Sequence, residues 1–98
     1  MVAYFSEFVV SPGKRDAVCD AFHRLAVNDS TRCLQTISAS EADAPRRVFV
    51  LHFFANEEDA NGFKEDLSAL VLSLSPHLDV VSPLRKLDVA LKASGTAA

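Results

Sequence analysis

His52 is the residue of this chain whose type and setting most invite chemistry. It stands alone in the apolar stretch of residues 46–56, RRVFVLHFFAN. A histidine gains and loses a proton near neutral pH, which suits it to general acid–base catalysis or ligand binding. The alternative is that His52 only fixes packing by bonding to Glu7, to water or to a partner chain. The residues leave both interpretations open.

Few other residues fall into a catalytic or metal-binding pattern. The sequence contains no Cys-His cluster, no glycine-rich phosphate loop and no nucleophile elbow. Cys19 and Cys33 lack metal-ligand spacing, and we interpret both as buried thiols. The acidic residues 57–59 complement a helix dipole and do not indicate a metal site. We therefore predict no metal.

Composition narrows the classes of partner. The chain has 98 residues and a net charge of −3, without a stripe of Lys and Arg, which argues against nucleic-acid binding. No apolar run approaches the roughly 20 residues that span a bilayer. The first residues lack the features of a signal peptide, so we expect a cytoplasmic protein. Apolar residues make up 49% of the chain, which is rich for so small a core and suggests burial against a partner.

The positions of these residues depend on six predicted elements, in the order strand, helix, strand, strand, helix, strand. The predicted strands are Val2–Val10, 33–40, 46–56 and 80–89. Ser11 is the expected cap of the first helix, and Asn56 that of the second. Pro83 places the last strand at an edge. The order is the ferredoxin-like βαββαβ arrangement of an α+β protein, a four-stranded antiparallel sheet with both helices on one face. We expect one domain over residues 1–90 and a flexible tail over 91–98.

Both faces of the strand at 46–56 are apolar, although helices can cover only one of them. The simplest cover for the second face is the same face of another copy. We assign Leu51 and Phe53 to the helix side and expect His52 beside Glu7 on the other. The residues expected at this dimer face are Phe5, Glu7, Val9, Val50, His52 and Phe54.

Four segments of the sequence then resemble a known family. They are SPGKRDAV at 11–18, CLQ at 33–35, FVLHFFANEEDA at 49–60 and VSPLRKLDV at 81–89. Together they are similar to the antibiotic biosynthesis monooxygenases, a family of dimeric α+β barrels, over residues 3–89. The resemblance implies a homodimer with a pocket between sheet and helices in each subunit. Some members oxidise polycyclic aromatic phenols or quinols with O₂ and without a cofactor, others cleave haem or isomerise a phosphorylated sugar-like signal, and several have no known reaction.

Several positions depart from the family pattern. Ala55 stands where many relatives have Trp or Tyr, Phe53 where they have Glu, and Lys64 where they have His. Ser6 occupies the position of the Asn used by haem-degrading members, and their helix-two His falls near Ser73. The departures argue against haem cleavage and against the isomerase activity.

Two functions remain. One is cofactor-independent oxygenation of an aromatic phenol, quinol or polyketide-type substrate, with His52, Tyr4 and Lys64 as candidate catalytic residues. The other is a non-catalytic dimeric module that binds a small ligand or has a structural role. The residues expected to line a ligand pocket are Tyr4, Ser6, Phe8, Leu51, Phe53, Phe63 and Lys64. A pocket of this kind should enclose on the order of 300 Å³.

Overall fold

Five strands and two α-helices make up residues 1–90, the part of the chain that the computed structural model describes. The expected tail, 91–98, lies outside the described residues. The strands are β1 (Val2–Val10), β2 (Cys33–Glu41), β3 (Ala44–Phe54), β4 (Leu78–Val81) and β5 (Arg85–Asp88). The helices are α1 (Arg15–Asn28) and α2 (Glu57–Leu74), followed by a 3₁₀ turn at Ser75–His77.

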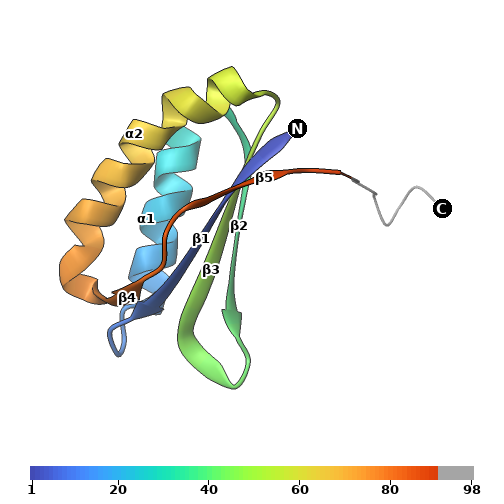
Figure 1. The fold of residues 1–98 in the computed structure, drawn as a ribbon. Coiled ribbons are helices and arrows are strands. Elements are labelled where there is room, and N and C mark those ends of the chain that lie inside the picture. Colours follow the sequence, from blue (N-terminus) through green and yellow to red (C-terminus); the bar gives the residue numbers. More distant parts are fainter. Residues whose placement is uncertain (91–98) are drawn as a thin grey trace.

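The strands form one antiparallel sheet with the order β2-β3-β1-β4, and β5 also pairs with β1. Both helices pack on the same side of this sheet (Figure 1). The central position of β1 and β3 and the one-sided helices confirm the predicted ferredoxin-like α+β fold. Within residues 1–90, no helix is long and apolar enough to cross a membrane.

The predicted fourth strand is split into two by a short connection. β4 ends where Val81 pairs with Phe8, and β5 begins where Arg85 pairs with Phe5. Three residues, 82–84, therefore lie opposite only two residues of β1. Pro83 has no N–H to give to the ladder, which explains why pairing stops there. The connection leaves the sheet next to Ser6.

The two helices begin differently from one another. Asn56 caps α2 as predicted, because its side-chain oxygen accepts a hydrogen bond of 2.9 Å from the backbone N–H of Asp59. The prediction that Ser11 caps α1 is wrong. The cap residue is Lys14, and the Ser11 hydroxyl lies 2.9 Å from an Asp79 carboxylate oxygen, to which it donates. Gly13, at φ 77°, makes the turn between Ser11 and the helix.

The side of β3 that faces the helices is the opposite of the predicted one. Val50, His52 and Phe54 are fully buried against the helices, whereas Leu51 and Phe53 are half-buried on the outer face. The physical reason is the register of β3 on β1. Directly opposed residues of a strand pair share a face, and a register shifted by one residue would exchange the two faces. Both faces of β3 are apolar, so its own sequence does not select between them.

Candidate functional site

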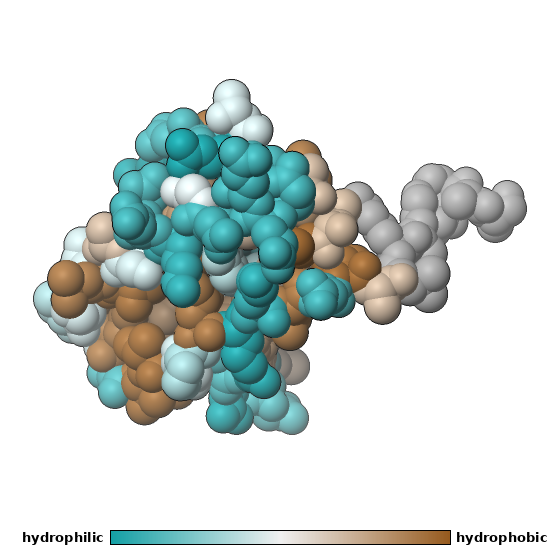
Figure 2. All heavy atoms as spheres, turned by 45° about the horizontal axis from the view of Figure 1, so that its top comes forward, coloured by the Kyte–Doolittle hydropathy of each residue, from teal (hydrophilic) through white to brown (hydrophobic). Residues whose placement is uncertain are grey.

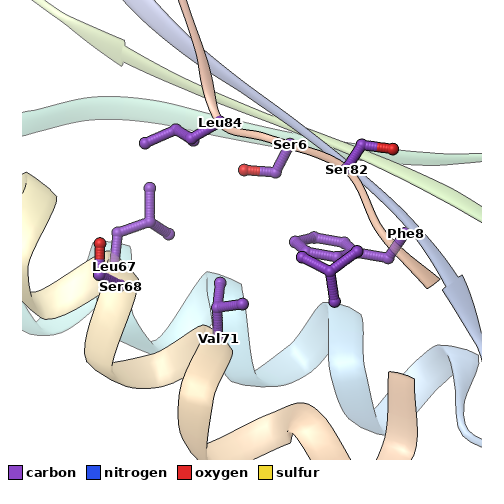
Figure 3. Close-up of a pocket in the computed structure, with 8 residues that line it drawn as sticks. Ser6, Phe8, Leu67, Ser68, Val71, Ser82 and Leu84 are labelled. Atoms are coloured by element: carbon purple, nitrogen blue, oxygen red, sulfur yellow. The ribbon is translucent and has the colours of Figure 1, made fainter. Parts of the chain in front are cut away.

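A cavity of about 170 Å³ lies between the sheet and α2. Its floor comes from β1, one wall from α2, and the other wall from the end of β4 and the connection to β5 (Figure 3). The lining is mostly apolar with three hydroxyl groups: Ser6, Phe8, Leu67, Ser68, Val71, Val81, Ser82 and Leu84. Because the β4–β5 connection turns away from the ladder, the sheet and α2 do not close over this space.

The cavity opens at the surface. Val81 lines it and is still 47% exposed. The space-filling view in Figure 2 shows hydrophilic residues over the end of the molecule where α2 begins and hydrophobic residues gathered to the lower left. The hydrophilic end agrees with the three acidic residues, 57–59, in the first turn of α2. A ligand can therefore enter from solvent and meet apolar side chains.

Ser6 is the polar group at the floor of this cavity. Its side chain is only 3% exposed, and its Oγ has no hydrogen-bond partner among the described residues. In Figure 3 the hydroxyl points into the space bounded by Leu84, Leu67 and Val71. A buried hydroxyl without a partner costs about 1–3 kcal/mol. A ligand oxygen at this point would recover the missing hydrogen bond.

His52 is the second unusual polar group, and it lies inside the core. It has no exposed surface, and neither ring nitrogen has a partner among residues 1–90. The ring centroids of Phe22 and Phe63 lie 6.0 and 5.2 Å from that of the imidazole. Burial, together with the nearby His23, lowers the pKa of His52 from 6.5 to about 4. The imidazole is therefore neutral at pH 7.

Ser6 and His52 lie on the same face of the sheet, on neighbouring strands. Ser6 pairs with Val50, and Tyr4 pairs with His52, so the two polar residues are diagonal neighbours. Such neighbours lie roughly 7 Å apart. Within residues 1–90 they are the two buried polar side chains. The serine can hold an oxygen atom of a ligand, and the imidazole can accept a proton, although His52 itself does not line the cavity.

Only some of the residues predicted to line a ligand pocket line the cavity. Ser6 and Phe8 line the cavity. Tyr4 is buried on the same face and packs against Phe54, and Phe63 is in the core beside His52. Leu51 and Phe53 were predicted to line the pocket but lie on the outer face, and Lys64 is exposed on α2.

The residues missed by sequence reasoning come from two places. Leu67 and Val71 belong to the apolar stripe of α2, and Ser68 lies next to it, so the α2 wall could have been found. The stripe consists of Ala60, Phe63, Leu67, Leu70, Val71 and Leu74. The wall made by Val81, Ser82 and Leu84 depends on the break at Pro83, whereas the sequence analysis predicted one continuous strand over 80–89.

The outer face of the sheet carries a second cluster of side chains. Phe5 and Phe49 pack with ring centroids 6.0 Å apart, and the guanidinium of Arg85 lies 4.8 Å above the Phe5 ring. A Glu7 carboxylate oxygen lies 3.2 Å from Arg47 Nε, and the other oxygen lies 3.7 Å from Arg85 Nη2. This face is therefore apolar with a charge-balanced centre.

The predicted dimer face is corrected in the same way as the pocket. Phe5, Glu7 and Val9 do lie on the outer face, but Val50, His52 and Phe54 are in the core. The predicted pair of His52 with Glu7 is wrong, because the two side chains lie on opposite faces of the sheet. The partners of Glu7 are arginines instead.

Comparison with known proteins gives a match of structure only. No protein-family model matches the sequence, and no curated protein matches it either. A solved structure from Deinococcus radiodurans, provisionally named an antibiotic biosynthesis monooxygenase, superimposes with a TM-score of 0.75 at 9% identity, over 96% of this chain and 97% of that one. A protein of the same provisional name from Chloroflexus aurantiacus gives a TM-score of 0.73 at 14% identity, over 96% of each chain.

A third similar structure carries no activity in its name. It is a conserved protein from Methanosarcina mazei, with a TM-score of 0.72 and 14% identity, over 88% of this chain and 89% of that one. At identities of 9–14% these likenesses establish the fold and not the reaction. The chain thus has the ferredoxin-like α+β fold of solved proteins that are named antibiotic biosynthesis monooxygenases.

Proposed function

We propose that this protein oxidises a small phenol or quinol with O₂ in the cavity beside Ser6, without a bound cofactor. The observation that carries the proposal is the unpartnered Ser6 hydroxyl at the floor of an apolar cavity that opens to solvent. The provisional names of the similar structures agree with it. An apolar cavity with one hydrogen-bonding group is suited to a ring that bears a hydroxyl.

The proposed reaction balances with O₂ as the only co-reactant. Loss of the hydroxyl proton makes the ring electron-rich, so that a ring carbon that bears hydrogen, opposite the oxygen in a phenol or next to it in a quinol, can bond to O₂. One oxygen atom becomes a carbonyl on that carbon. The second oxygen leaves as water with the ring hydrogen and the hydroxyl proton, and the substrate supplies all four electrons. The product is a quinone.

His52 is our candidate for the proton acceptor. Because it does not line the cavity, the proton has to reach it through a water molecule beside Ser6, and the pKa of His52 limits the substrate. An ordinary phenol has a pKa near 10, whereas that of His52 is about 4. Proton transfer between them would be uphill by about 8 kcal/mol before any attraction between the two ions. The reaction therefore suits a ring whose hydroxyl is unusually acidic, such as a quinol that also carries a carbonyl group.

Oxygen uptake tests the proposal. Purified protein is mixed with a single-ring quinol that bears a ring carbonyl, and O₂ is followed with an electrode against the same mixture without protein. We expect uptake that rises with protein concentration and falls at least about tenfold in Ser6→Ala, since one hydrogen bond to the reacting oxygen is lost. Uptake equal to the protein-free rate would overturn the proposal.

A second candidate function is non-catalytic binding of a small ligand. Two observations favour it: the cavity of about 170 Å³ is smaller than a usual ligand pocket, and the pKa of about 4 makes His52 a weak base. This alternative predicts that the same quinol binds and returns unchanged. Product analysis by mass spectrometry after the electrode experiment separates the two functions.

We also propose that a second copy covers the outer face of the sheet. The support is the cluster of half-buried Phe5, Phe49, Leu51 and Phe53 around a Glu7 whose charge is already balanced by arginines.

The two cysteines are unpaired, which suits a reducing compartment such as the cytoplasm.

A further inference from the structure

We infer that the cavity selects neutral ligands of a single aromatic ring and that Ser6 determines this specificity by bonding both the phenol and its quinone product. The inference rests on the proposed function for the phenol class and adds the size, the charge and the orientation of the ligand. The inference excludes fused-ring substrates, which the sequence analysis did not exclude.

The volume of the cavity sets the size of the ligand. A cavity of about 150 Å³ lined by apolar side chains holds one benzene molecule. The space beside Ser6 encloses about 170 Å³, which is enough for one ring with a small substituent. A second fused ring would have to displace the wall residues Leu84 and Val71 or lie outside in solvent.

The lining sets the charge of the ligand. All eight lining residues are neutral: five are apolar and three are serines. A carboxylate or phosphate buried here would lose its hydration and gain no cationic partner, which is costly. A cation would likewise find no carboxylate among these eight residues. The cavity therefore favours an uncharged ring over a charged one of the same shape.

The chemistry of the Ser6 hydroxyl sets the orientation. A serine hydroxyl has one hydrogen to donate and two lone pairs that accept. Its oxygen can accept from a phenolic O–H, and after rotation of its hydrogen the same hydroxyl can donate to a quinone carbonyl. Because the hydroxyl points into the cavity and has no protein partner, the ligand oxygen must lie at the floor, with the far side of the ring toward the opening. Substituents at that far end can extend into solvent.

The β4–β5 connection makes the wall that limits the ring. Leu84 belongs to the three residues that lie opposite two of β1, and in Figure 3 it faces Leu67 and Val71 of α2 across the cavity. Its side chain is half-buried. Shortening it should widen the cavity while leaving the Ser6 floor unchanged.

A binding panel tests the inference without turnover. The probes are phenol, acetophenone, toluene, benzoate and 2-naphthol, each titrated into the whole chain while NMR shifts of the cavity-lining residues are followed. We expect phenol and acetophenone to bind, benzoate not to bind, and 2-naphthol to bind more weakly than phenol. Ser6→Ala should weaken phenol and acetophenone by roughly tenfold and leave toluene unchanged, because only the first two use the hydroxyl.

Two matched variants complete the design. Ser73→Ala removes an exposed hydroxyl of α2 that does not line the cavity and should leave every affinity unchanged. Leu84→Ala should admit 2-naphthol with an affinity equal to or better than that of phenol. Equal losses for toluene and phenol in Ser6→Ala, or tight binding of 2-naphthol to the unaltered protein, would overturn the inference.

Failure of this inference is distinguishable from failure of the proposed function. If no single-ring probe shifts the lining residues, the inference is wrong, even if oxygen uptake with a larger quinol shows that the protein is an oxygenase. If the probes bind as expected and no phenol or quinol consumes O₂, the ligand class stands and the oxygenase proposal falls.

Discussion

At the scale of single residues, the burial of His52 lowers the free energy of unfolding, and the packing of the rest of the core must compensate for it. Its neutral imidazole is buried among aromatic rings with both nitrogens unpartnered. An apolar residue of similar volume would not bury two nitrogens without partners. The histidine therefore either has a function or is a residue whose destabilising effect the fold tolerates. The two explanations give different results in experiments on stability and activity.

The first prediction concerns pH. The pKa of His52 is about 4 in the folded protein and near 6.5 when unfolded, so between these values the unfolded chain binds the proton and the folded chain does not. The stabilisation is fully present above pH 6.5 and is lost as pH falls toward 4, by about 3 kcal/mol in total. Urea unfolding at pH 7 and pH 4.5 measures most of this loss. The loss should shrink in His52→Leu, and an equal loss in both proteins would show that a group other than His52 causes it.

The second prediction separates packing from function at the same residue. His52→Leu removes two buried nitrogens that have no partners, so we expect the free energy of unfolding at pH 7 to rise by about 1–2 kcal/mol. If His52 accepts the substrate proton, oxygen uptake should fall at least about tenfold in the same variant. A stabilised variant with unchanged uptake would show that His52 is a packing residue. A variant destabilised at pH 7 would show that the imidazole contributes a favourable contact and not a net cost.

At the scale of elements, the sequence predicted most of the fold but not the face of β3. The order of strands and helices, the cap at Asn56 and the edge position of the last strand all follow from local patterns and turn residues. The face of β3 depends on its register against β1, which is a long-range pairing, and both of its faces are apolar. The same error placed Leu51 and Phe53 in the predicted pocket, although they lie on the outer face.

The candidate site was predictable only where it rests on β1 and α2. Ser6 and Phe8 were among the residues expected to line the pocket, and Leu67 lies in the stripe of apolar residues that recurs at three- and four-residue steps along α2. The third wall was not predictable, because it arises from a mismatch of three residues against two between the β4–β5 connection and β1. A proline marks where pairing can stop, but it does not say which way the chain then turns.

The third prediction compares two residues that the sequence treats as equivalent caps. Asn56→Ala removes the side-chain acceptor for the Asp59 N–H and should lower the free energy of unfolding by about 1 kcal/mol. Ser11→Ala removes only a surface hydrogen bond to Asp79 and should cost less, about 0.5 kcal/mol. Urea unfolding of both variants gives the comparison. A larger loss for Ser11→Ala would contradict the assignment of Lys14 as the cap of α1.

At the scale of the whole molecule, the two faces of the sheet have different roles. The helix side holds the core and the cavity, whereas the outer side presents aromatic rings around Glu7, Arg47 and Arg85. A two-fold partner would bury those rings and keep the charges paired. Because β3 faces the opposite way from the sequence-based assignment, a substitution at His52 tests the core, and a test of assembly must be made at Phe49 or its neighbours.

The fourth prediction is that Phe49→Glu abolishes the dimer. Phe49 lies directly opposite Glu7 in the β1–β3 register, so the new carboxylate would stand beside an existing one on an apolar face. Like charges directly opposite one another in a strand pair are destabilising, and burying the second one without its own cation adds to the cost. Sedimentation equilibrium should show a dimer for the unaltered protein and a monomer for the variant. Leu72→Glu is the matched control, since Leu72 is 75% exposed on α2 and the dimer should persist. A monomeric unaltered protein, or a dimer in both variants, would show that the outer face is not where two copies meet.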